Sequence, residues 1–118
     1  MEFNFKIETN VEERKKEYIK MKNNFPEKIP VICERDPKSN LIDIDKNKYL
    51  VPDDFAVSQL NEMLRKRVIF NSYEPFYLLF NGKDCVTGDK ILREIYEKYK
   101  DSQDGFLYIG YTDDLTYI

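Results

Sequence analysis

The sequence has no histidine and no tryptophan, and only two of its 118 residues are cysteine. The absence of histidine removes the most common general base at neutral pH, the histidine-activated nucleophiles and most zinc sites. Cys33 and Cys85 lie far apart and form no CxxC motif, which excludes a disulfide framework and suits a reducing compartment. The adjacent carboxylates at 53–54 and 113–114 form no acid–base pair, because neighbouring side chains on a strand or turn point apart. We therefore expect no metal, no cofactor and no enzymatic activity.

Long apolar runs are missing as well. No stretch approaches the roughly 18 consecutive apolar residues of a membrane-spanning helix, and the first residues lack the pattern of a secretory signal. We therefore expect a soluble, cytoplasmic protein. A chain of this length is typical of one domain and buries roughly two-thirds of its unfolded surface. We predict a single domain over residues 1–118, with an N-terminal helical arm at 1–26 and a core at 27–118.

The charge of the chain is small and uneven. The net charge is −3; residues 1–70 carry 14 basic and 13 acidic groups, whereas residues 71–118 carry 5 and 9. Residues 14–28 hold six basic side chains against two acidic ones. This segment fits either a solvated helix face or a surface for acidic partners. Nucleic acid is not an expected partner, because its binding normally requires a basic domain.

Apolar periodicity predicts seven elements in the order helix, strand, strand, helix, strand, helix, strand, which is an α+β pattern. The helices are expected at 10–25, at 55–69 and from residue 89 onward, and the strands at 28–35, 48–52, 75–80 and 105–111. Upstream, Phe3, Phe5 and Ile7 alternate as in a strand, but the segment is too short to assign.

Two helices have recognisable start signals. Asn10 is the expected cap of the first helix, with Glu13 as its capping-box partner, and Pro26 ends that helix. Asp53 or Asp54 is the expected cap of the second.

The strand at 48–52 has the features of a sheet edge. Tyr49 and Val51 face one way, and Lys48 and Leu50 face the other. Pro52 has no N–H to donate to a neighbouring strand, so a proline at this end favours an edge position.

Four segments carry a further signal in their order and spacing. KIPVICE at 28–34, DKNKYLVP at 45–52, LRKR at 64–67 and GFLYIGY at 105–111 resemble the autophagy ubiquitin-like modifier family, typified by the GABA type A receptor-associated protein and the light chain 3 of microtubule-associated proteins. The likeness covers essentially the whole chain. It implies a ubiquitin-like roll (β-grasp) with two extra N-terminal helices, in which residues 27–118 form the roll.

The resemblance also implies a function. Family members are conjugated through a C-terminal glycine to phosphatidylethanolamine, which requires a processing protease and ubiquitin-like activating and conjugating enzymes. They are cytoplasmic, and lie on autophagosomal membranes when lipidated. They bind cargo receptors and autophagy factors through short aromatic-x-x-aliphatic motifs. Such a motif pairs its backbone with an exposed strand edge and places its two anchors in separate pockets.

Carried over position by position, the family's two pockets fall on named residues here. The aromatic pocket is expected to comprise Glu17, Met21, Pro30, Ile32, Lys48, Leu50 and Phe106. The aliphatic pocket is expected to comprise Tyr49, Val51, Pro52, Phe55, Leu60, Met63 and Leu64. Acidic residues that flank the motif are expected to meet Lys28, Lys46 and Arg67.

Several of these residues also fit a purely structural role. Ile32 and Leu50 on a strand, and Leu60 and Leu64 on an amphipathic helix, are typical core positions. Met63 falls off that helical stripe, and its flexible thioether suits a surface that accepts varied partners.

The C-terminal tail departs from the family pattern, because Tyr117-Ile118 stands where the resemblance places an aromatic residue followed by glycine. A β-branched Ile118 should clash in the narrow channel through which the tail is activated. Either the sequence stops before or alters that glycine, or the protein works unconjugated. The alternative to an autophagy modifier is thus a non-conjugated ubiquitin-like scaffold outside autophagy. Met21 and Phe55 are smaller, apolar departures that should reshape the pockets without abolishing them.

Overall fold

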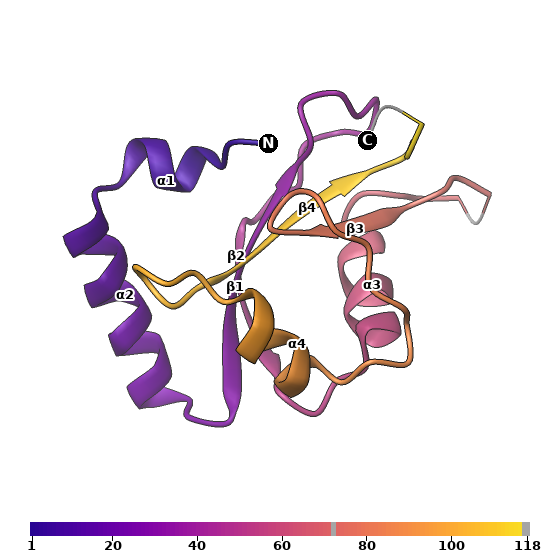
Figure 1. Cartoon of the computed structure of the whole chain (residues 1–118). Helices are drawn as coiled ribbons and strands as arrows, with labels where there is room; N and C mark the ends of the chain where they lie inside the picture. The colour runs from indigo at the N-terminus through magenta and orange to yellow at the C-terminus, as the bar shows by residue number, and fades with distance from the viewer. Residues whose placement is uncertain (72, 117–118) are drawn as a thin grey trace.

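The computed structural model describes residues 1–71 and 73–116 (Figure 1). Four helices and four strands lie within these residues, so the predicted α+β class is correct. In chain order they are α1 (Asn4–Glu8), α2 (Val11–Asn24), β1 (Lys28–Arg35), β2 (Lys48–Pro52), α3 (Val57–Arg65), β3 (Tyr77–Phe80), α4 (Leu92–Tyr99) and β4 (Leu107–Thr112).

The strands form one mixed sheet in the order β2-β1-β4-β3. The central strands β1 and β4 are parallel, with Ile32 opposite Tyr108, whereas β2 and β3 are antiparallel to their neighbours. A parallel central pair flanked by antiparallel edges is consistent with the expected ubiquitin-like roll. The predicted edge position of β2 is confirmed, since among the described residues only β1 pairs with it.

The sheet is covered on both faces. Val31 and Cys33 of β1 point into the main core beneath α3 and α4, whereas Ile32 points to the opposite face, beneath α1 and α2 (Figure 1). All three side chains are fully buried, which explains why β1 is apolar at successive positions. Burial also raises the pKa of the Cys33 thiol, as expected for a structural cysteine.

The first residues form a helix rather than a strand. The short helix α1 has no side-chain cap of its own. Instead, the carboxylate of Glu34 accepts the N–H groups of Asn4 at 2.7 Å and Phe5 at 3.0 Å. Phe3 and Phe5 are 5% exposed and pack against aromatic rings of the core. The alternation of these phenylalanines therefore reflects one docked helical turn, and the partner that stabilises it is remote in sequence.

A buried ion pair fastens the start of α2 to the core. The Nε of Arg14 lies 2.8 Å from an Asp104 carboxylate oxygen, and the two side chains are only 6% and 0% exposed. The Arg14 Nη1 also donates to the carbonyl of Thr9 at 2.6 Å. The helix itself begins as predicted, because the Asn10 side chain accepts the N–H of Glu13 at 3.0 Å.

Two predicted helix starts are wrong. The N-cap of α3 is Ala56 rather than Asp53 or Asp54, and α4 follows Ile91 rather than Asp89. The two helix starts lie side by side and bond each other through an isolated bridge between Ala56 and Ile91. Backbone carbonyls of the neighbouring segment thus accept N–H groups that an aspartate cap would otherwise satisfy.

Candidate peptide-binding site

The outer edge of β2 offers free backbone groups. The Cys33 N–H donates to the Asn47 carbonyl at 2.8 Å, and the Asp53 N–H donates to the Glu27 carbonyl at 3.1 Å. In an antiparallel pair, residues that bond the neighbour alternate with residues that do not. Lys48 and Leu50 fall at the alternate positions, so their N–H and C=O groups point away from β1. An extended segment can therefore pair with β2 at these two residues.

The residues predicted for the aromatic pocket gather on the face of the sheet beneath α2. Ile32 and Phe106 are fully buried and form the floor of one apolar cluster. Met21 of α2 packs against this cluster. Pro30 and Leu50 are cross-strand partners beside it.

A cation lies at the edge of this cluster. The Lys48 ammonium forms an ion pair with Glu17 of α2 and lies 5.0 Å from the centre of the Phe5 ring. The Lys48 and Glu17 side chains are 37% and 34% exposed. Ion pairs so open to solvent contribute only about 0–1 kcal/mol. An incoming side chain can therefore displace Lys48 at little cost.

The residues predicted for the aliphatic pocket divide into a floor and a rim. Tyr49, Val51, Leu60 and Leu64 are at most 7% exposed and belong to the main core. Phe55 and Met63 are half-buried, and they line an open depression of about 560 Å³. Pro52 is half-buried at the end of β2.

The rim of this depression includes three polar residues that the sequence analysis did not predict. They are Gln59, Glu62 and Lys66. Because these residues and Met63 recur at helical spacing on α3 and its C-cap, a helical projection of residues 59–66 could have identified them.

Basic side chains lie at both ends of β2. The Lys46 ammonium and the Arg67 guanidinium each lie 5.5 Å from the centre of the Tyr49 ring. Arg67 donates two hydrogen bonds of 3.1 Å to Asp45, and these lower the pKa of that carboxyl. Lys28 is placed apart from them, opposite Pro52 at the other end of the strand.

The phenol of Tyr49 is a buried polar group on β2. Burial raises the pKa of its hydroxyl to about 12, against the opposing effect of the neighbouring Arg67 guanidinium. The side chain is therefore neutral at physiological pH. Its ring serves as the surface over which Lys46 and Arg67 lie.

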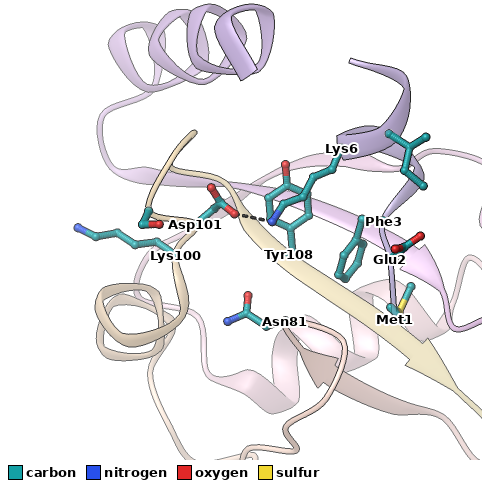
Figure 2. Close-up of a pocket in the computed structure, with 10 residues that line it drawn as sticks. Met1, Glu2, Phe3, Lys6, Asn81, Lys100, Asp101 and Tyr108 are labelled. Carbon is teal, nitrogen blue, oxygen red and sulfur yellow. Dashed lines mark hydrogen bonds and ion pairs between the residues drawn. The ribbon is translucent and has the colours of Figure 1, made fainter. Parts of the chain in front are cut away.

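A separate cavity of about 550 Å³ lies between α1 and β4 (Figure 2). Lys6 spans it, with its ammonium 2.5 Å from Asp101 and 4.5 Å from the centre of the Tyr108 ring. Burial alone would raise the pKa of Asp101, but the bond from Lys6 and two backbone N–H donors lower it overall. No local signal predicts this cavity, because its walls come from three distant segments.

The predicted tail residues Tyr117 and Ile118 are outside the described residues, so the structure does not bear on the C-terminal tail. Among the residues it does describe, no helix is long and apolar enough to span a bilayer.

Comparisons with known proteins agree with this architecture. The family model described as "Autophagy protein Atg8 ubiquitin like" matches residues 13–118. Human microtubule-associated protein 1 light chain 3 gamma is 37% identical over 114 residues, which cover 96% of this chain and 77% of that protein. Autophagy-related protein 8 of Pichia angusta is 40% identical over 117 residues, covering 99% and 92%. Autophagy-related protein 8e of Arabidopsis thaliana is 37% identical over 113 residues, covering 96% and 91%. The chain therefore belongs to the Atg8 family of ubiquitin-like autophagy proteins.

Proposed function

We propose that this protein is an autophagy adaptor that binds short aromatic-x-x-aliphatic motifs by adding them as a strand to β2. The observation that carries this proposal is the free edge of β2, which runs between an apolar cluster and an apolar depression on opposite faces of the sheet. Strand addition supplies main-chain hydrogen bonds, and the two hollows supply sequence preference. Its partners are then motif-bearing cargo receptors and autophagy proteins.

The aromatic anchor of the motif enters over Ile32 and Phe106 after Lys48 has moved away from Glu17. The released ammonium is then free to meet an acidic residue of the motif. The aliphatic anchor enters the depression lined by Phe55 and Met63. Only a handful of residues become ordered, so we expect micromolar affinity, roughly −8 kcal/mol.

Acidic residues before the motif meet the basic groups around β2. Lys46 and Arg67 are held over one ring at one end of the strand, and Lys28 lies at the other end. Because Lys46 and Arg67 are exposed and Lys28 is half-buried, we expect these charges to change association rate and salt dependence more than the final affinity.

Titration with a motif peptide, followed by NMR of the backbone amides, tests the site. Shifts should concentrate at residues 28–32, 46–67 and 106. Lys48→Glu combined with Leu50→Ala should weaken binding by about ten-fold or more, through lost apolar contact and reversed charge. Unchanged affinity in this double variant would refute the pocket assignment.

Glu17→Gln provides a matched test of the closed pocket. Removing the partner of Lys48 leaves the floor intact, so the peptide should bind up to about five-fold more tightly. Lys16→Gln, one position earlier on α2, changes charge without touching Lys48 and is the control. Weaker binding in Glu17→Gln would show that the ion pair supports the pocket rather than closes it.

We also propose that a natural form ending in the glycine expected at the position of Ile118 is conjugated to phosphatidylethanolamine and resides on autophagosomal membranes, with a cytoplasmic unconjugated pool; a chain ending in Ile118 itself should stay unconjugated. This proposal is supported by family membership. Its partners are a processing protease and the ubiquitin-like activating and conjugating enzymes. The intact mass of the protein from its native cell tests it: a mass increase equal to one phospholipid is expected, and a purely unconjugated population favours the scaffold alternative.

A further inference from the structure

The connection between α3 and β3 displays two aromatic side chains to solvent. Phe70 is 87% exposed and Tyr73 is 94% exposed, the highest values among the large hydrophobic side chains that the structure describes. Leaving such rings in water forgoes the stabilisation that burial would provide. Neither ring belongs to the peptide-binding site described above.

Both ends of the connection between α3 and β3 are buried in the core. Ile69 and Phe76 are 7% and 6% exposed and anchor the connection in the main core. Between them, the Asn71 side-chain oxygen accepts the N–H groups of Tyr73 and of the following residue, both at 3.0 Å. The Arg65 guanidinium donates to the Asn71 carbonyl at 3.2 Å. The exposed rings therefore project from an anchored turn.

The charge beside these rings is positive. Residues 65–74 contain three basic side chains and one acidic side chain, Glu74, in a chain whose net charge is −3. Lys66 and Arg67 are exposed, Arg67 being paired with Asp45, and Arg65 is half-buried at the end of α3. This arrangement complements a negatively charged surface.

The exposure of the rings indicates what kind of surface they meet. A side chain that lines a groove is partly covered by the groove's other walls, whereas Phe70 and Tyr73 are almost uncovered. A partner that can surround both rings therefore fits this exposure. A bilayer interface does so without a shaped complementary surface: aromatic rings settle at the headgroup level, and basic residues attract anionic lipids.

We propose that Phe70 and Tyr73, together with the basic cluster Arg65–Arg67, form a contact surface for anionic phospholipid bilayers. This contact goes beyond the motif binding proposed above and requires no conjugation.

The position of the C-terminal segment adds support that rests on the proposed conjugation. Tyr77, the first residue of β3, pairs with Thr112, the last residue of β4. The aromatic turn and the chain after β4 therefore leave the sheet at the same end (Figure 1). A lipid joined to the C-terminal tail would bring the turn close to the bilayer.

Vesicle flotation of the unconjugated full chain tests the proposal. Vesicles of phosphatidylcholine mixed with phosphatidylserine should carry the protein, and vesicles of phosphatidylcholine alone should carry much less. Phe70→Ser with Tyr73→Ser should weaken binding to the anionic vesicles by about ten-fold or more. Lys66→Gln should weaken it by about five-fold. Phe25→Ser is the matched control, since Phe25 is an exposed aromatic at the end of α2.

A fluorescence variant locates the contact. Because the chain has no tryptophan, Phe70→Trp introduces the only indole, and its emission should shift to the blue on anionic vesicles. Phe25→Trp should show no such shift. The proposal is overturned if anionic vesicles do not bind the protein, if the double serine variant binds them as the wild type does, or if the indole at position 70 responds only to a motif peptide. Motif affinity of the double serine variant, measured alongside, should equal that of the wild type; its loss would count against the peptide site as placed, independently of the vesicle result.

Discussion

The buried pair of Arg14 and Asp104 allows the attachment of the N-terminal helices to be measured. Arg14→Met keeps the length and apolar stem of the side chain but leaves the Asp104 carboxylate buried without its cation. Removing one partner of a buried pair typically costs about 3–5 kcal/mol. Asp104 keeps two donors, the Tyr108 hydroxyl at 2.5 Å and the Phe106 N–H at 2.8 Å. We therefore expect a loss near the lower end, about 3 kcal/mol.

Urea denaturation measures this loss. With a slope of about 1–3 kcal/mol per molar urea, the midpoint of Arg14→Met should fall by roughly 1–3 M. Lys15→Met is the matched control on the same helix, because Lys15 meets only an exposed Glu12 at 4.0 Å. It should change stability by no more than about 0.5 kcal/mol.

A double-mutant cycle isolates the interaction. Asp104→Asn alone should also destabilise, whereas the combination with Arg14→Met should lose less than the sum by at least about 1 kcal/mol. Strictly additive losses, or a loss below about 1 kcal/mol for Arg14→Met, would show that the pair does not fasten the arm to the core.

Three further predictions concern single sites. A thiol reagent should modify only Cys85 in the native protein and reach Cys33 only in denaturant, because Cys33 is fully buried and its pKa is raised by that burial; fast labelling of both thiols would contradict this. The pKa of Asp101 is lowered in the folded protein, so its charge stabilises the fold above the ordinary value of 3.8 and that contribution is lost as pH falls through the lower folded value. The urea midpoint should therefore drop in acid, and Lys6→Gln should reduce the drop; an unchanged acid profile would argue against this pairing. Gly105→Ala should destabilise by about 2 kcal/mol or more in thermal melts, because the residue has a φ of +90° and a Cβ there would lie 2.7 Å from an aromatic ring; a wild-type melting temperature would contradict this.

The sequence was most informative where local chemistry decides the structure. The cap at Asn10, the stop at Pro26 and the apolar stripe of α3 predicted helices at their observed places. The alternation around Tyr49 predicted which side chains of β2 share a face, and Pro52 indicated that this strand is an edge. These features depend on interactions within a few residues, so they can be recognised in the sequence alone.

Long-range partners decided the rest. The alternating phenylalanines near the N-terminus form a helical turn because Glu34, some thirty positions away, accepts its first N–H groups. The start of α3 is satisfied by backbone from the segment before α4 rather than by an aspartate. No local sequence pattern predicts such hydrogen bonds, because the two partners are distant in sequence and come within bonding distance only when the chain has folded.

The sequence by itself determined the element order, the apolar faces, the open strand and, through its four segments, the likeness to a family. Only the tertiary structure decided that Leu60 and Leu64 lie in the core while Met63 lines an open depression, that Lys48 pairs with Glu17, and that two aromatic rings remain in solvent between α3 and β3. The physical reason is that burial and charge pairing depend on which distant surfaces meet, whereas periodicity reports only which side of an element is apolar.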